Sequence, residues 1–229
     1  MSKIDQYGFN TQWIHPEVQA SVYRQFATKS ALSQGEKEYI LSHTAADEGF
    51  CRRLVERLAK YLRRTDSVLS VAEGDGHLLR ALMDRGFRDV LGVDICAELV
   101  ALGQAKGVNL QQADATRLPF ENNTFDAVVI NEAIGALGLT DALLETRRVL
   151  KPLGKLIITT YNYTEYRRKD VFNTKMKYRY LTSGVILKAL RDKKFAKVAM
   201  TSIPIEPEST GFKEDRMDMI IAEKLRYQR

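Results

Sequence analysis

Apolar runs of strand length alternate with amphipathic runs of helix length between Ser67 and Thr160, and this alternation limits the fold more than any other feature. The strand-like runs are SVLSVA, VLGVDI, NLQQADA, FDAVVIN and GKLIITTY, and helical runs such as LLRALMDRG, AELVALGQAKG and TDALLETRRVLKP separate most of them. This alternation predicts parallel strands joined by crossover helices. Because VVI and LIITT are continuously apolar, we expect an α/β fold whose sheet is buried on both faces.

The segments on either side of this region have different patterns. Residues 1–29 are rich in large side chains but lack a helical period, so we expect them to cover part of the core. Residues 47–64 place Phe50, Leu54 and Leu58 on one face of an amphipathic helix. Near the end of the chain, a helical run and the runs KVAMTSIPI and DMIIAEK predict a helix followed by an antiparallel strand pair.

Size and composition narrow the class of protein. With 229 residues, 45% of them hydrophobic and 28% charged, the chain fits one globular domain with a sizeable core. It has neither an apolar run near the ~20 residues of a membrane span nor a secretory signal pattern, so we expect a soluble, cytoplasmic protein without a membrane partner. Cys51 and Cys96 lack the spacing of a disulfide framework or a zinc site, and we expect two buried thiols and no metal.

Positive charge is concentrated in the last third of the chain. The net charge is +6, but residues 155–229 carry 17 Lys and Arg against 9 Asp and Glu, whereas residues 1–154 carry 18 against 20. This asymmetry fits an anionic substrate or partner, and a solvated basic face explains it as well.

Glycines or polar residues stand at the carboxyl ends of the first four predicted strands. The first strand ends in AEGDG, which contains Gly74 and Gly76, and the next three end at Asp94, Asp114 and Asn131. In open parallel sheets, ligands bind beyond these ends, where the strand order reverses. The bare backbone of a glycine turn before a helix suits the close approach of a small molecule. We therefore expect one ligand cleft at these strand ends.

The order and spacing of these segments resemble the class I S-adenosylmethionine-dependent methyltransferases, especially their small-molecule group. The resemblance rests on the glycine turn, on Asp94 eighteen residues after Gly76, and on the stretches QADATRLPFENNTFDAVVINEA and LLETRRVLKPLGKLIITTYN. It is strong over residues 65–160 and looser in the tail. A dinucleotide-binding dehydrogenase shares only the glycine turn.

This resemblance implies a Rossmann-like fold with a mostly parallel seven-stranded sheet, a C-terminal antiparallel hairpin and an N-terminal helical lid. Residues 1–64 would form the lid and leading helices. Residues 65–229 would form the cofactor-binding core, with a substrate-capping insertion at about residues 161–180.

The resemblance also implies a role for each matched position. Gly74 and Gly76 would let the methionine portion of S-adenosylmethionine approach the backbone, with free amides of the next helix nearby. Asp94 would accept hydrogen bonds from both ribose hydroxyls, because a carboxylate has two acceptor oxygens. Asp114 would accept from the adenine amino group, and the amide of Ala115 would address a ring nitrogen. The structural alternatives are a helix-capping Asp94 and a surface Asp114.

Three further positions complete the implied cofactor site. Ile95 and Leu118 would enclose the adenine ring. Asn131 would face the methionine portion and the transferable methyl group.

Two positions depart from the family's usual acid-x-G-x-G-x-G turn. Ser70 stands where an acid helps to hold the cofactor's ammonium group, and Ala72 stands where the first glycine is usual. We expect Glu73 to compensate for the missing acid if it turns inward. We expect Ala72 to fit only with a negative φ. A catalytically inactive relative therefore stays open as an alternative.

Methyl transfer from a sulfonium requires alignment of the acceptor and exclusion of water, and it needs no covalent residue. A general base helps when the acceptor is a hydroxyl or an acidic carbon. The candidate bases are His15, Glu132, Tyr161 and Tyr163, and surface or packing duty explains His15 equally well.

The connection at residues 161–180 contains five tyrosines and a cluster of Lys and Arg, which suits an anionic or aromatic acceptor, although a solvated loop is the plain alternative. The predicted function is S-adenosylmethionine-dependent methyl transfer to N, O or C of a small anionic or aromatic metabolite. The alternatives are a methyltransferase on RNA or protein that docks through the basic third, and an inactive binding or regulatory subunit. The oligomeric state and the pathway have no signal in the sequence.

Overall fold

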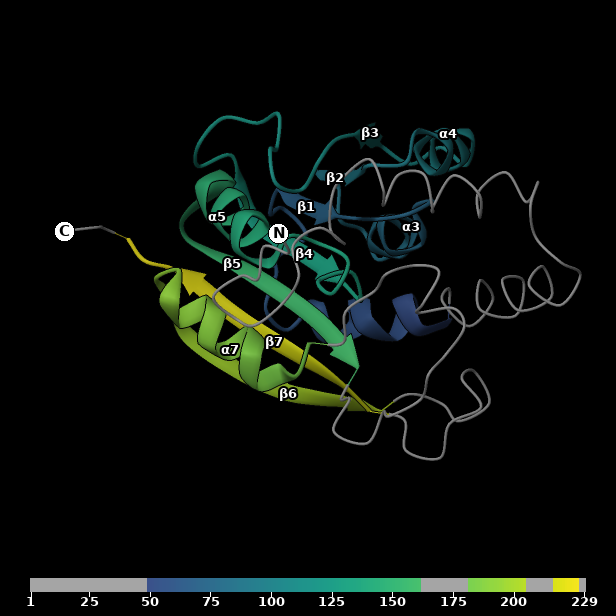
Figure 1. Ribbon diagram of the computed structural model, residues 1–229. Coiled ribbons are helices and arrows are strands. Elements are labelled where there is room, and N and C mark those ends of the chain that lie inside the picture. Colours follow the sequence, from purple (N-terminus) through teal and green to yellow (C-terminus); the bar gives the residue numbers. More distant parts are fainter. Residues whose placement is uncertain (1–48, 162–180, 205–215, 227–229) are drawn as a thin grey trace, which may run out of the picture.

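A seven-stranded sheet runs through the computed structural model, which describes residues 49–161, 181–204 and 216–226 (Figure 1). The strand order is β3-β2-β1-β4-β5-β7-β6, with β3, β2, β1, β4 and β5 parallel and β7 antiparallel to both of its neighbours. The mostly parallel sheet with an antiparallel hairpin is thus confirmed. The strands are β1 (Val68–Val71), β2 (Val90–Asp94), β3 (Leu110–Gln112), β4 (Phe125–Asn131), β5 (Leu150–Tyr161), β6 (Phe195–Pro204) and β7 (Arg216–Lys224).

Helices cover both faces of the sheet, as Figure 1 shows. Along β4, the completely buried side chains of Ala127 and Val129 join one core, whereas those of Val128 and Ile130 join the other. The first core includes residues of a helix at 49–58 and of α3, and the second includes residues of α5 and α7. The numbered helices are α3 (His77–Asp84), α4 (Ala97–Ala105), α5 (Leu139–Val149) and α7 (Ser183–Asp192).

The helix boundaries follow local signals in most places. Thr182 caps α7, and its side chain accepts a hydrogen bond from the amide of Val185 at 3.4 Å. The predicted helix through residues 140–152 instead ends at Val149. The chain enters β5 at Leu150, before Pro152, because pairing with β4 begins there.

Several sequence expectations can be checked in the described residues. The helix predicted over residues 47–64 ends at residue 58, and it buries Phe50, Leu54 and Leu58 as its period predicted. Cys51 and Cys96 are buried, and neither forms a disulfide within the described residues. Neither a metal-binding cluster nor a helix able to cross a membrane occurs in the part of the chain that the structure describes. The predicted lid at residues 1–48 and most of the predicted insertion, residues 162–180, lie outside the described residues.

Candidate active site

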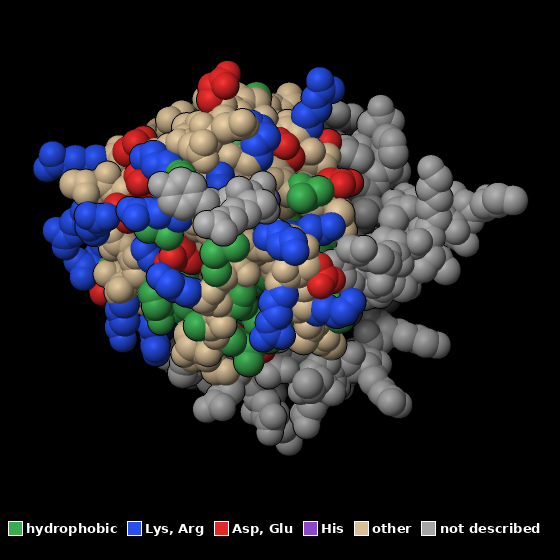
Figure 2. Space-filling view, turned by 90° about the vertical axis from the view of Figure 1, so that its left-hand side faces the viewer, with side chains coloured by type: hydrophobic (Ala, Val, Ile, Leu, Met, Phe, Trp, Pro, Cys, Tyr) green, Lys and Arg blue, Asp and Glu red, His purple; other side chains and the backbone are tan. Residues whose placement is uncertain are grey.

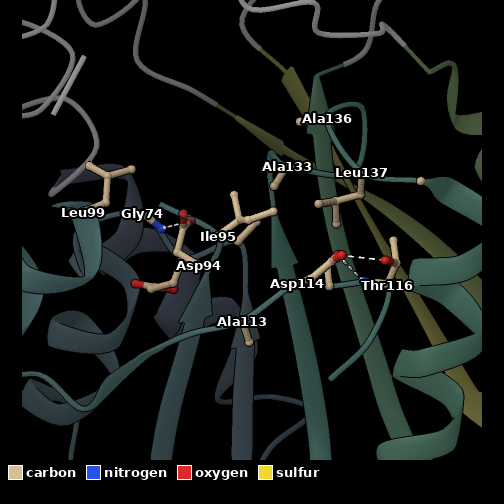
Figure 3. Close-up of a pocket in the computed structure, with 14 residues that line it drawn as sticks. Gly74, Asp94, Ile95, Leu99, Ala113, Asp114, Thr116, Ala133, Ala136 and Leu137 are labelled. Atoms are coloured by element: carbon tan, nitrogen blue, oxygen red, sulfur yellow. Dashed lines mark hydrogen bonds between the residues drawn. The ribbon is translucent and has the colours of Figure 1, made fainter. Parts of the chain in front are cut away.

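A cleft opens at the carboxyl ends of β1, β2 and β4, where the strand order reverses between β1 and β4 (Figure 3). Seven of the eleven predicted cofactor positions line it, and further lining residues come from α4 and from the segments after β3 and β4. The seven predicted residues are Ala72, Glu73, Gly74, Asp94, Ile95, Asp114 and Ala115.

In the turn after β1, every second residue from Ala72 to Gly76 has a positive φ, in the left-handed region. Ala72 has φ 55°, Gly74 has φ 71° and Gly76 has φ 94°. The expectation of a negative φ at Ala72 is therefore wrong, and the Cβ of this alanine is held in a conformation that costs about 1 kcal/mol. A Cβ at Gly76 would lie 2.4 Å from Cγ2 of Val108, so only glycine permits this close packing against Val108. Gly76 does not line the cleft.

Asp94 is the best-anchored side chain of the cleft. One carboxylate oxygen accepts from the amide of Gly74 at 2.8 Å, and the other accepts from the amide of Cys96 at 2.9 Å. Burial raises the pKa of this carboxyl, although hydrogen bonds from the amides of Cys96, Gly74 and Ile95 oppose the shift. Because Cys96 is the N-cap residue of α4, the aspartate holds the start of that helix as well as lining the cleft.

Glu73 turns inward beneath the same turn. The buried hydroxyl of Ser70 donates to one of its carboxylate oxygens, and the amide of Leu79 donates to the other at 2.9 Å. Gly76, the N-cap residue of α3, has no side chain to cap the helix, and the Glu73 carboxylate satisfies this first-turn amide instead. The expectation of free amides at the start of α3 is therefore wrong for Leu79. Burial raises the pKa of Glu73 to about 7, and the nearby charge of Asp94 adds to the effect.

Asp114 and Thr116 face Gly74 and Asp94 across the cleft, with Ile95 between them (Figure 3). One oxygen of Asp114 accepts from both the amide and the hydroxyl of Thr116, each at 2.8 Å. These bonds fix the carboxylate at the rim, in a short turn that follows β3.

Three predicted residues lie beside the cleft rather than on its lining. Ser70 is completely buried under Glu73, and Gly76 packs on Val108. The side-chain oxygen of Asn131 accepts from the hydroxyl of Thr159 at 2.6 Å, so this asparagine is tied to β5.

The candidate bases have different positions. Glu132 follows β4 with φ 54°, and its amide donates to the carbonyl and the hydroxyl of Thr159, each at 3.1 Å. Tyr161 is the last residue of β5, and its side chain lies outside the described part of the chain, as do His15 and Tyr163.

Leu118, which was expected to enclose adenine, does not line the cleft. Its side chain is 4% exposed in the core that includes α5, and its amide donates to Glu145 at 2.8 Å. The walls that the sequence analysis missed come instead from small or apolar residues, which carry no chemical signature of their own. They are Leu99, Ala113, Thr116, Ala133, Ala136, Leu137 and Gly138.

The lining gives the cleft an acidic character. It includes the carboxyl groups of Glu73, Asp94 and Asp114, and none of its described residues is Lys, Arg or His. Partly buried carboxylates without a nearby cation favour a ligand that brings positive charge.

A family model described as a methyltransferase domain matches residues 69–158, the region that contains every described wall of this cleft. Residues 69–158 form a class I methyltransferase domain. S-adenosylmethionine is the cofactor of this family, so the identification agrees with the expectation drawn from the glycine turn and the strand ends.

Curated relatives of the methyltransferase domain include two enzymes named for quinone biosynthesis. A demethylmenaquinone methyltransferase of Renibacterium salmoninarum is 33% identical over 102 residues, which are 43% of this chain and 43% of the relative. The ubiquinone/menaquinone biosynthesis C-methyltransferase UbiE of Teredinibacter turnerae is 36% identical over 116 residues, 44% of this chain and 45% of the relative. The similarity thus spans less than half the length of either relative.

Solved structures share the fold over more of the chain. A SAM-dependent methyltransferase from Thermotoga maritima has a TM-score of 0.69 at 17% identity and covers 90% of this chain and 99% of its own. Phosphoethanolamine N-methyltransferase 2 of Haemonchus contortus, solved with S-adenosylhomocysteine, has a TM-score of 0.61 at 17% identity and covers 72% of this chain and 50% of its own.

Proposed function

We propose that this protein transfers the methyl group of S-adenosylmethionine to a small molecule. The observation that carries the proposal is the fixed carboxylate of Asp94 at the tip of β2, facing the cleft beside the glycine turn. A carboxylate has two acceptor oxygens, which suits the two adjacent hydroxyls of a ribose.

The described residues fit the rest of the cofactor. Asp114 and the amide of Ala115 would receive the adenine ring, with Ile95 against its face. The cofactor carries both a sulfonium and an ammonium group, and its positive charge matches the acidic lining of the cleft.

Glu73 would take the place of the family's acid at the ammonium end. Ser70 occupies the position of that acid, and its hydroxyl donates to Glu73, which lines the cleft only three residues later. The site would thus keep one negative charge, supplied from the turn instead of the strand.

The sulfonium of the bound cofactor supplies an electrophilic methyl group. The chain therefore has to orient the acceptor and keep water from the reacting atoms. Glu132 is a candidate base because it follows β4 with its amide held by Thr159, and Tyr161 is a second candidate at the tip of β5. His15 stays a prediction from the sequence.

The acceptor end of the cleft is proposed to take an aromatic molecule. Ala133, Ala136 and Leu137 form a wall of small and apolar side chains after β4, which suits a flat ring. The relatives named as demethylmenaquinone and ubiquinone/menaquinone methyltransferases support a hydroxylated ring as the first candidate, with transfer to carbon. Residues 161–180 are rich in tyrosine and arginine, so we include acceptor rings with anionic substituents in this candidate class.

Calorimetric titration with S-adenosylhomocysteine tests the cofactor site directly. Asp94→Asn keeps the shape of the side chain but removes its charge and one acceptor oxygen, and we expect binding to weaken about tenfold to a hundredfold. Asp89→Asn is the matched control, because Asp89 is an exposed acid just before the opposite end of β2. Equal affinity in both variants would contradict the assignment of Asp94.

Turnover is tested with radiolabelled S-adenosylmethionine and a panel of hydroxylated aromatic acceptors, with and without carboxylate groups. We expect labelled product from at least one quinol-type acceptor. Cofactor binding without methyl transfer to any small acceptor, but with transfer to RNA or protein, would overturn the choice of acceptor and leave the cofactor site intact.

A further inference from the structure

The end of the sheet opposite the cleft carries a concentration of positive charge. Residues 144–155, 187–197 and 223–226 together contain eleven Lys and Arg and three Asp and Glu. The pairing of Phe195 with Lys224 and of Lys155 with Glu223 brings these segments to one end of the sheet. Figure 2 looks onto this end and shows green hydrophobic side chains among blue Lys and Arg side chains.

Leu153 is an exposed leucine in a strained backbone conformation at this end. It has φ 65°, a value that bulky residues rarely adopt, and its side chain is 41% exposed. The next residue must be glycine, since a Cβ on Gly154 would lie 2.8 Å from the carbonyl oxygen of Lys151. The turn therefore holds an apolar side chain toward solvent at a cost in backbone energy, and such strain is concentrated at functional sites.

A second exposed leucine follows the neighbouring strand, β7. Leu225 is 43% exposed and follows the last residue of β7. Lys155 pairs with Glu223 in antiparallel register, and Leu153 and Leu225 are each two residues along the chain from that pair. Lys224 fixes this corner, because its ammonium donates to the carbonyl of Leu150 at 2.6 Å.

We propose that this end of the sheet, the basic leucine face of residues 144–155, 187–197 and 223–226, docks on an anionic phospholipid surface. Lysines and arginines are attracted to the negative potential of such a surface, and the two leucines enter the interface between headgroups and acyl chains. This contact is peripheral and needs no spanning segment. The cleft, at the other end of the sheet, then faces away from the lipid and stays open to the cofactor.

The side-chain chemistry favours lipid over nucleic acid. Single-stranded nucleic acid is bound by aromatic side chains that stack on bases, whereas the exposed large side chains of this face are leucines. Aliphatic side chains gain free energy by entering hydrocarbon but gain little against a phosphate backbone.

Cosedimentation of the full chain with vesicles tests the proposal. One vesicle type contains about one part phosphatidylglycerol to two parts phosphatidylcholine, and the control vesicle is pure phosphatidylcholine. We expect binding to the anionic vesicles at about 0.1 M salt, strong weakening at about 0.5 M, and no binding to the neutral vesicles.

Matched substitutions separate the two contributions. Arg226→Gln removes one charge of the face and weakens partitioning about fivefold, whereas Arg52→Gln, beside Gly76 at the cleft end, leaves it unchanged. Leu153→Ala keeps the backbone constraint and weakens partitioning about tenfold. Leu102→Ala, which shortens a leucine with 44% exposure on α4, leaves it unchanged.

Leu153→Gly tests whether misfolding explains a loss of vesicle binding. It relieves the positive φ, so the melting temperature rises while vesicle binding falls. The proposal is overturned if anionic vesicles do not bind the protein, or if Leu153→Ala binds them as well as the original chain. Tighter binding to single-stranded RNA, weakened by Arg226→Gln but not by Leu153→Ala, would assign the face to nucleic acid instead.

Discussion

The hydroxyl of Ser70 donates a hydrogen bond to the carboxylate of Glu73, so the strand residue and the turn residue share one buried polar site. Glu73 also receives the amide of Leu79, which belongs to the first turn of α3. This carboxylate therefore joins the end of β1 to the start of the next helix. Its proton equilibrium then affects both the stability of the fold and the charge of the cleft.

Cofactor binding is expected to release a proton from Glu73. The pKa of this group is about 7 in the free protein because burial disfavours its charged form, and a cationic ligand group nearby lowers it. Since the ligand prefers the ionised form, affinity rises with pH and is about tenfold higher at pH 8 than at pH 6. Calorimetry in buffers of different ionisation enthalpy measures the released proton. Asp94 is the other nearby carboxyl that can contribute to this profile.

Glu73→Gln should flatten this pH profile for S-adenosylhomocysteine. Methylthioadenosine, which lacks the amino acid portion, should show little pH dependence even with the original chain. A profile that persists in Glu73→Gln would assign the proton to another group and leave the cofactor proposal standing.

Stability without ligand should fall as the pH rises from about 4.5 to 7. Glu73 has a higher pKa in the folded state than in the unfolded state, so over this range the folded protein binds more protons. Raising the pH then favours the unfolded state, by about 2 to 3 kcal/mol in total for this group. Denaturant unfolding at pH 5 and pH 8 measures the change, and Glu73→Gln should show a smaller one.

Ala72→Gly should stabilise the protein by about 0.5 to 1 kcal/mol. Glycine adopts φ 55° without the steric cost that the Cβ of alanine carries, although it also gives the unfolded chain more freedom. A fall in the midpoint of urea unfolding would mean that the methyl group of Ala72 contributes packing that outweighs the strain.

Two helical glycines should respond in opposite directions to substitution by alanine. A Cβ on Gly103 of α4 would lie 2.2 Å from a methyl carbon of Leu110 and 3.0 Å from the carbonyl oxygen of Asp75, so Gly103→Ala should cost about 1 to 3 kcal/mol. A Cβ on Gly184 of α7 would lie 3.9 Å from its nearest neighbour, the hydroxyl oxygen of Thr182, so Gly184→Ala should gain up to about 1 kcal/mol of stability. Thermal unfolding of both variants measures the difference.

The sequence predicted the sheet well because its signals are local. Continuous apolar runs such as FDAVVIN predict a strand buried on both faces, and β4 is such a strand. The polar strand ends at Asp94 and Asp114 were predictable because parallel strands bring their carboxyl ends to one edge.

The sequence was less informative where tertiary contacts decide the outcome. The φ of Ala72 is set by the path of the turn between β1 and α3, and the periodicity of the sequence does not predict it. Leu118 has the hydrophobicity of a residue against adenine, yet its amide is bound by Glu145 and its side chain enters the core. Ala133 and Ala136 line the cleft only because the connection after β4 folds back over the strand tips.

The cleft is assembled from segments spread between Ala72 and Gly138, so none of its walls exists before β1, β2 and β4 have paired. A molecule bound there would contact the four connections that follow β1, β2, β3 and β4 and would hold them together. Its occupancy would raise the resistance of the entire parallel half of the sheet to proteolysis, in proportion to ligand concentration relative to its dissociation constant. Protection from proteases would therefore offer a measure of cofactor binding that needs no knowledge of the acceptor.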